Sequence, residues 1–233
     1  LFVKSKEKSK RISFSIIKSS FRSIKRTFIQ LRTYKETFKF LIARLVYNDA
    51  LITIFAFGGI YAKEVFNFTF NEIFLFGIIL NVTAGLGAFL VGFLDDKLGG
   101  KRIIQLSNYG FIVACTLSVI SPSIDDIVIL QSVGIDGRLI FWFSGVLIGI
   151  FSGPNQSASR SLMGRLTPSD KKNEFFGFYA FSGKATAFLG PLLFSTIVSF
   201  TGSLRYGLSI VVILFLLGIF LLSFVYEKKG IKS

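Results

Sequence analysis

Two charged residues within apolar stretches are the first candidates for chemistry in this sequence. Asp49 lies nine residues after Phe40, and Lys184 lies ten residues after Glu174. At 1.5 Å per residue in a helix, each charge is about 14 to 15 Å inside its stretch. A charge at that depth in a membrane is costly unless it is paired or faces water. Asp49 and Lys184 therefore either form a structural ion pair or line an aqueous cavity, with Asp49 coupling a proton or cation and Lys184 meeting an anionic group.

Neutral polar side chains within the apolar stretches extend this set of candidates. An unpartnered polar group costs free energy in hydrocarbon, so such residues indicate either a packed helix interface or a water-filled path. The stretch around Asp49 is rich in them, whereas residues 208–225 contain only two serines and no charge. The predicted pathway residues are Asp49, Asn48, Asn81, Asn155, Gln156 and Lys184. Arg44 and Arg160 lie nearer the ends of their stretches and are interpreted as anchors at the membrane surface.

Catalytic and metal chemistry is disfavoured by the residues that are present. The sequence contains no His and one Cys, Cys115, which lies alone in an apolar stretch. Ser and Asp side chains have no base placed beside them for nucleophilic catalysis. The adjacent pair Asp95 and Asp96 lies in a basic loop, where a helix cap or a solvated charge is the expected role. We therefore expect no enzyme activity, no metal site and no cofactor.

The elements that carry these residues are predicted to be transmembrane helices. The chain has 233 residues, 52% hydrophobic, and a mean hydropathy of +0.64. About 20 apolar residues in a helix are needed to cross a bilayer. Six stretches qualify: about 40–62, 72–94, 103–121, 139–163, 174–200 and 204–226. The sequence thus predicts an all-α membrane protein with six transmembrane helices between a basic segment, 1–39, and a short tail, 227–233.

The distribution of positive charge predicts the orientation of these helices in the bilayer. The net charge is +14, and 22 of the 27 Lys and Arg residues lie in residues 1–39, the loops at 95–102 and 160–173, and the tail. The opposite loops contain only Lys63, Arg138 and Arg205. Positively charged loops are retained in the cytoplasm. Both chain ends are therefore predicted to be cytoplasmic, as an even number of spans requires.

Residues 1–39 read as a basic amphipathic helix on a membrane surface. Apolar residues recur at spacings of three and four between Ile17 and Leu31, with Lys and Arg on the other faces. A cytoplasmic linker, a mitochondrial transit peptide and a nucleic-acid-binding arm share this composition. We favour the linker, with no nucleic-acid partner. Because the chain begins with Leu and its only Met is Met163, we expect it to be part of a longer protein.

Small residues and prolines predict how the helices pack and bend. Glycine or serine recurs every fourth residue from Gly145 to Ser161, and a shorter stripe runs from Ala84 to Gly92. Such stripes allow helix backbones to approach closely. Pro154 and the pair Gly190-Pro191 lie within predicted spans. A proline there frees a backbone carbonyl and bends or interrupts the helix, a feature useful where one part of a bundle moves against another.

The loop between the second and third predicted spans carries a recognisable motif. Residues 92–102 read GFLDDKLGGKR and resemble the loop motif that follows the second helix of each half of a major facilitator superfamily transporter. Gly100 departs from the pattern, which usually has Arg there. We expect Asp96 to cap a neighbouring helix or pair with a base until gating breaks the contact. The predicted gating loop comprises Gly92, Asp96, Lys97, Gly99, Lys101 and Arg102.

Several segments are similar to the C-terminal half of the vacuole-effluxer family, also called autophagy-related protein 22-like. They are residues 47–49, 55–61, 81–85, 153–160 and 181–184. This resemblance covers about residues 36–226 and implies a twelve-helix transporter of which the chain supplies helices seven to twelve. It also implies that the first and fourth spans line a central cavity and that the third and sixth spans face lipid. Fungal members of the family are associated with amino-acid efflux from the vacuole.

These observations together predict part of a secondary active transporter. The expected mechanism is alternating access of a small solute, with amino acids and protons as candidates and a missing N-terminal six-helix half as partner. A single half cannot enclose the path alone. The alternative is a membrane scaffold or receptor-like protein that transports nothing. The expected location is a bacterial inner membrane, with the lipid bilayer around the helices.

Overall fold

The structure, a computed structural model, describes residues 34–126, 134 and 136–227, except for the side chains of residues 93–97, 125 and 126. The chain divides into two units, Leu1–Lys35 and Glu36–Ser233. The fold and the contacts below are those of the second unit. The amphipathic helix predicted between Ile17 and Leu31 lies outside the described residues.

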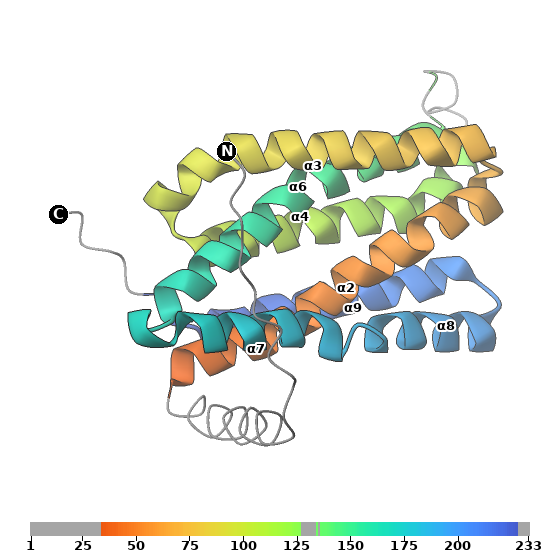
Figure 1. The fold of residues 1–233 in the computed structure, drawn as a ribbon. Helices are drawn as coiled ribbons and strands as arrows, with labels where there is room; N and C mark the ends of the chain where they lie inside the picture. Colours follow the sequence, from red (N-terminus) through yellow and green to blue (C-terminus); the bar gives the residue numbers. More distant parts are fainter. Residues whose placement is uncertain (1–33, 127–133, 135, 228–233) are drawn as a thin grey trace, which may run out of the picture. The chain divides into compact units, whose positions relative to one another are not determined.

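The described part of the chain is a bundle of α-helices (Figure 1). Its α-helices are α2 (Lys35–Phe66), α3 (Phe70–Leu98), α4 (Gly100–Ile120), α6 (Gly137–Leu166), α7 (Lys172–Ala185), α8 (Leu189–Thr201) and α9 (Leu204–Ser223). Short 3-10 turns, η1 (Ser121–Asp126) and η2 (Ser169–Lys171), follow α4 and precede α7. Six segments are long and apolar enough to cross a bilayer, with α7 and α8 together forming the fifth. The predicted all-α membrane fold is confirmed.

The small-residue stripes pack α3 directly against α6. The sequence predicted close helix contacts at these stripes, and the structure identifies the two helices as partners. A Cβ atom added to Gly153 would lie 2.0 Å from the Ala84 carbonyl oxygen, and one added to Gly149 would lie 1.8 Å from the Thr83 hydroxyl. A Cβ on Gly87 would meet the Ile150 carbonyl at 2.1 Å. Any side chain at these positions would force the two helix backbones apart. α3 and α6 therefore form one tightly joined pair.

The two prolines act differently on their helices. Pro154 lies inside α6, and the helix continues past it to Leu166. The fifth span is interrupted, but the break comes at residues 186–188, just before the predicted position. Pro191 is then the third residue of α8. The first turn of a helix leaves its N–H groups without intrahelical partners, so proline costs no hydrogen bond there.

The long helix α2 connects the α3–α6 pair to the remaining helices. The Tyr61 hydroxyl donates to the Ser118 carbonyl of α4 at 2.8 Å. A Cβ on Gly218 of α9 would meet the Tyr47 side chain at 2.7 Å, and a Cβ on Gly190 of α8 would meet the Asp49 carbonyl oxygen at the same distance. α2 is therefore fixed on several sides, and its polar residues are held in defined places within the bundle.

Candidate functional site

A small polar pocket lies where α2, α6 and α7 meet. Its volume is about 60 Å³. The lining residues are Arg44, Tyr47 and Asn48 from α2, Asn155, Gln156, Ser159 and Arg160 from α6, and Tyr179 from α7. Three of the predicted pathway residues, Asn48, Asn155 and Gln156, are thus brought together. The pocket also holds the two arginines that the sequence analysis assigned to the membrane surface.

Arg44 is turned across the pocket towards α7. Its guanidinium carbon lies 3.7 Å from the centroid of the Tyr179 ring, a cation–π geometry. Its Nη1 donates to the Tyr179 carbonyl oxygen at 2.9 Å and to the Ser182 hydroxyl at 3.1 Å. Beside it, the Asn48 amide donates to the Gly183 carbonyl oxygen at 3.0 Å. Arg44 therefore joins α2 to α7, a contact that the sequence did not predict.

A chain of buried hydrogen bonds supports the pocket from behind. The Ser159 hydroxyl donates to the Asn155 carbonyl at 2.6 Å, so the 2.8 Å contact between Tyr47 and Ser159 has the tyrosine hydroxyl as donor. The Asn155 amide nitrogen donates to Asn108 Oδ1 on α4 at 3.0 Å. Asn108 is fully buried, and its own Nδ2 has no hydrogen-bond partner in the described part of the chain. The chain thus runs from α2 through α6 to α4.

Asn108 is not among the residues predicted from the sequence. It is an amide within an apolar span, the same signal that identified Asn155 and Asn81, but it lies on a span expected to face lipid. The structure shows that its side chain points to the interior and accepts the hydrogen bond from Asn155.

Asp49 lies at the break between α7 and α8. Its side chain is buried, and its Oδ1 accepts a hydrogen bond from the Thr186 hydroxyl at 3.2 Å. The backbone N–H of Gly190, in the first turn of α8, also donates to this carboxylate. The N-terminus of a helix carries partial positive charge and unpaired N–H groups, so it stabilises a carboxylate.

Lys184 does not pair with Asp49. It is exposed near the end of α7, and within the described ranges no carboxylate forms an ion pair with it. The structural ion pair considered from the sequence is therefore absent. Asp49 is instead held by hydrogen bonds from the α7–α8 junction, which leaves the Lys184 ammonium at the surface.

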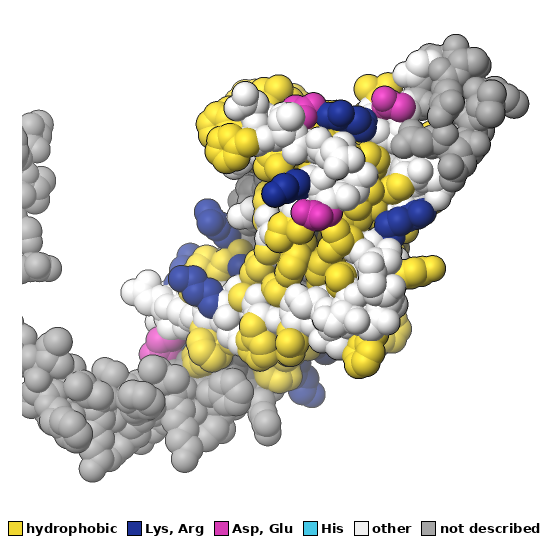
Figure 2. Space-filling view, turned by 90° about the vertical axis from the view of Figure 1, so that its right-hand side faces the viewer, with side chains coloured by type: hydrophobic (Ala, Val, Ile, Leu, Met, Phe, Trp, Pro, Cys, Tyr) yellow, Lys and Arg dark blue, Asp and Glu magenta, His cyan; other side chains and the backbone are white. Residues whose placement is uncertain are grey.

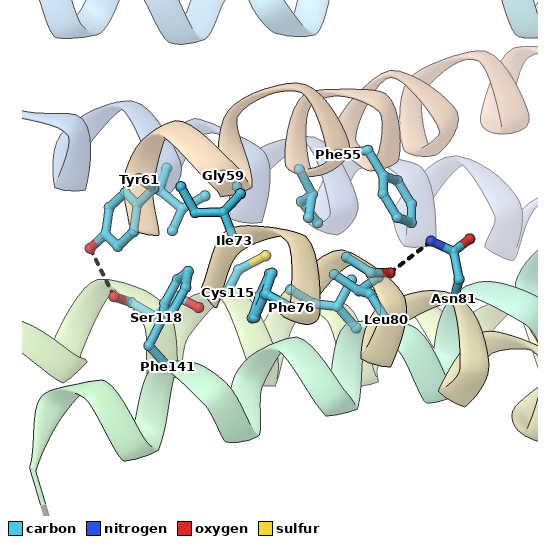
Figure 3. A pocket seen from close by; sticks show the side chains of 15 residues that line it. Phe55, Gly59, Tyr61, Ile73, Phe76, Leu80, Asn81, Cys115, Ser118 and Phe141 are labelled. Carbon is cyan, nitrogen blue, oxygen red and sulfur yellow. Dashed lines mark hydrogen bonds between the residues drawn. The ribbon is translucent and has the colours of Figure 1, made fainter. Parts of the chain in front are cut away.

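Asn81 lies apart from the polar pocket, beside a larger apolar cavity. This cavity has a volume of about 190 Å³ and lies between α2 and α3, with α4, α6 and α9 also contributing (Figure 3). Asn81 stands at one end of it, where its Nδ2 donates to the Gly77 carbonyl at 2.8 Å, and Tyr61 and Ser118 stand at the other. Figure 2 shows the end of the bundle at which α2 is joined to α3. The side chains in the hollow on this face are mainly hydrophobic.

The same side of α2 serves both cavities. Asn48 lines the polar pocket and Phe55, seven residues later, lines the apolar cavity. Residues seven apart lie on one face of a helix and about 10 Å apart along its axis. This face of α2 is therefore polar at Asn48 and apolar at Phe55. Asp49 lies between these two residues in the sequence.

The predicted gating loop is mostly helical. The backbone of residues 92–98 belongs to α3, and only Gly99, with φ +85°, separates it from α4. The side chains of Asp96 and Lys97 lie outside the described residues. Gly92 and Arg102 are exposed. The loop of residues 95–102 expected from the sequence is therefore two helix ends joined by a single glycine with a positive φ.

The N-terminus of α4 is capped by Glu227, which the sequence analysis placed in the tail. The Glu227 carboxylate accepts hydrogen bonds from the backbone N–H groups of Gly100 at 3.1 Å and Lys101 at 2.9 Å. It also forms an ion pair with Arg165 Nε of α6 at 2.9 Å. α4 has Gly99 at its N-cap position, without a side chain to cap it. Glu227 supplies that cap from a segment distant in sequence.

The segment 223–227, which we call the C-terminal strap, is also bound through its backbone. Lys101 Nζ donates to the carbonyl oxygens of Ser223 at 2.8 Å and Val225 at 2.6 Å. Lys39 Nζ of α2 donates to the Phe224 carbonyl at 3.1 Å. The backbone N–H of Tyr226 donates to the Glu36 carboxylate. The strap thus joins the ends of α2, α4, α6 and α9.

Comparison with known proteins places the chain in a family. The family model described as vacuole effluxer Atg22 like matches residues 1–233. The chain belongs to this family. The MFS-type transporter YxiO of Bacillus subtilis is 27% identical over 215 residues, which cover 92% of this chain and 47% of YxiO. No solved structure matches the chain significantly.

Fungal members of the Atg22-like family are also similar to this chain. Autophagy-related protein 22 of Kluyveromyces lactis is 28% identical over 176 residues, covering 76% of this chain and 35% of that protein. Autophagy-related protein 22-2 of Aspergillus fumigatus is 26% identical over 226 residues, covering 94% and 36%. The chain spans about half the length of YxiO and just over a third of the fungal proteins.

The family and the fold together make this Atg22-like chain an integral membrane protein. Its six apolar segments match the thickness of a bilayer, and the relatives include an MFS-type transporter. Within the described ranges, no group of three or more His, Cys, Asp or Glu side chains is placed to hold a metal ion. The polar pocket at α2, α6 and α7 is the candidate functional site.

Proposed function

We propose that the chain is the C-terminal half of a secondary active transporter that moves a small solute by alternating access. The observation that carries this proposal is the polar pocket lined by α2, α6 and α7, within an otherwise apolar bundle. Polar groups at membrane depth typically mark a solute or ion path. The MFS-type relative and the partial coverage of its length support a missing N-terminal half as partner.

The charge of the pocket favours a solute with an anionic group. Arg44 and Arg160 line it, Lys184 lies on the adjoining helix, and the lining includes no carboxylate. A volume of about 60 Å³ accommodates a group the size of a carboxylate, so the N-terminal half supplies the rest of the site. Amino acids, which carry such a group, are our proposed substrates, and efflux is the proposed direction because the family is described as vacuole effluxers.

Asp49 is the proposed proton-coupling residue. Its carboxylate is buried and is held by donors from the junction between α7 and α8. Protonation removes the charge that the N-terminus of α8 stabilises, so it weakens the contact between α2 and the fifth span. Proton binding and helix position are thereby linked.

The predicted orientation and location belong to the same proposal. Both chain ends lie in the cytoplasm, residues 1–39 form a linker to the first half, and the membrane is a bacterial inner membrane. The concentration of Lys and Arg on one side of the helices supports this orientation.

Uptake into proteoliposomes tests the proposal. The protein that contains both halves is reconstituted, and a panel of labelled amino acids is offered with and without a pH gradient. We expect gradient-dependent flux of at least one amino acid, and loss of the gradient dependence with retained exchange in Asp49→Asn. A folded protein that moves none of the panel would favour the alternative, a membrane scaffold or receptor-like protein.

A further inference from the structure

The helix α7 is a short segment bounded by two irregular regions. It runs for 14 residues between the 3-10 turn η2 and the break at residues 186–188. Only three of its side chains are buried: Phe175, Tyr179 and Ser182. A short helix between two irregular regions can turn as one unit, because the irregular residues absorb the change in backbone angles. α7 is therefore a candidate for independent movement.

Two side chains of α2 bind the C-terminal half of α7 through polar contacts. Arg44 bonds the Tyr179 carbonyl and the Ser182 hydroxyl and stacks on the Tyr179 ring. Asn48 bonds the Gly183 carbonyl, one of the terminal carbonyls that a helix leaves unpaired. Both donors belong to α2, and both line the polar pocket. The side chains that hold α7 are thus the side chains that a solute in the pocket would meet.

The break beyond α7 has the form of a hinge. Helical hydrogen bonding is replaced there by turns, with the N–H of Ala187 bonded to the Lys184 carbonyl at 3.3 Å and the N–H of Leu189 to the Thr186 carbonyl at 2.7 Å. α8 begins immediately afterwards, and its first turn is anchored on α2 through Gly190 and Asp49. A rotation at residues 186–188 would move α7 while α8 stays in place.

We propose that α7 is a gate that turns on residues 186–188 and is held closed against α2 by Arg44 and Asn48. An anionic group that enters the polar pocket competes with the Tyr179 and Gly183 carbonyls for these two donors and so releases the gate. This coupling rests on the proposed function of the pocket, but the gate itself can be measured without any solute.

Hydrogen–deuterium exchange of the full chain in lipid nanodiscs tests the gate. Arg44→Gln and Asn48→Leu are expected to speed exchange of the α7 amides roughly tenfold, the effect of losing one or two hydrogen bonds, with α4 and α8 unchanged. Arg205→Gln is the matched control, because Arg205 also donates to a carbonyl, that of Val119, and to a serine hydroxyl, that of Ser123. This control should leave α7 unchanged. Equal acceleration in all helices, or none in α7, would overturn the proposal.

A covalent lock separates the gate from the transport function. Gly164→Cys and Phe176→Cys, in a Cys115→Ala background that removes the only native thiol, allow a short bifunctional reagent to join α6 and α7. A Cβ on Gly164 would lie 4.0 Å from the Phe176 ring, and neither residue lines the polar pocket. We expect slowed α7 exchange in the cross-linked protein and, if the pocket transports, loss of uptake that cleavage of the linker restores. Faster α7 exchange in Arg44→Gln without uptake of any solute keeps the gate and rejects the transport function. Full uptake in the locked protein rejects the gate.

Discussion

The C-terminal strap and the α2–α7 contact differ in how the charges at helix ends are balanced. In the strap, a carboxylate meets the N-terminus of α4 and an ammonium meets the C-terminal carbonyls of α9, and Glu227 pairs with Arg165. At α7, a guanidinium and an amide bond carbonyls, and Lys184 remains without an ion pair in the described part of the chain. Helix ends whose charges are mutually satisfied give stability. A cation at a pocket that forms no ion pair with a carboxylate is available to bind an anionic ligand.

Two arginines on α6 give the sharpest test of this difference. Arg160 lines the pocket and Arg165, five residues later, pairs with Glu227. We expect Arg160→Gln to reduce uptake on the order of 100-fold, the loss typical for removing a cation that binds a desolvated anion, while the unfolding temperature is unchanged. Arg165→Gln should lower the unfolding temperature and leave the affinity for solute unchanged. Uptake and thermal unfolding of both variants in one detergent provide the measurements, and the reverse pattern would contradict the comparison.

The strap predicts a clear effect on stability. Glu227→Ala removes the cap of α4 and the partner of Arg165 together, and the expected loss is about 2 kcal/mol in the free energy of unfolding. Glu227→Gln keeps an acceptor oxygen for the N–H groups and should lose less. Glu64, an exposed carboxylate at the other end of α2, supplies the control variant Glu64→Gln. Equal stability of Glu227→Ala and this control would show that the strap contributes nothing.

The features that could be predicted from the sequence are those that one segment determines by itself. The six spans follow from long apolar stretches, and the stripe from Gly145 predicts that α6 packs closely against a neighbouring helix, because both depend on local composition and period. The pocket was found in part: Asn48, Asn155 and Gln156 meet, but Asn81 lies beside the apolar cavity. Which face of α3 turns towards α6 is decided by packing, and no single span contains that information.

The features that were missed join residues far apart in the chain. Glu227 caps α4 across more than a hundred residues, and a single acidic residue in a basic tail gives no sign of that contact. The break before α8 lies a few residues earlier than predicted. Pro191 fits the first turn of a helix, so the proline lies at the start of α8 and does not end a helix. Asn108 was overlooked because its span was assigned to lipid, although its side chain faces α6.

The close contact of α3 with α6 provides a stability effect of similar size, with a matched control. Gly153→Ala places a methyl group on the Ala84 carbonyl oxygen, so we expect a loss of about 1 to 3 kcal/mol as the backbones separate. Gly77→Ala lies on α3 where a Cβ meets nothing within 4 Å, and helix propensity predicts a neutral effect or a gain below about 1 kcal/mol. Chemical unfolding in mixed micelles distinguishes the two. Similar values for both glycines would mean that α3 and α6 pack more loosely than the structure shows.

The buried amide pair behind the pocket carries the smallest expected effect. Asn155→Leu leaves the fully buried Asn108 with neither Oδ1 nor Nδ2 bonded, so it should cost about 1 to 2 kcal/mol. Asn108→Leu together with Asn155→Leu removes both amides, and replacing two partners by apolar groups is close to neutral. The double variant should therefore be more stable than Asn155→Leu alone. Additive losses in this double-mutant cycle would show that the two amides act independently. The α6 wall of the pocket would then lack the rigid support from α4 that distinguishes it from the wall formed by α7.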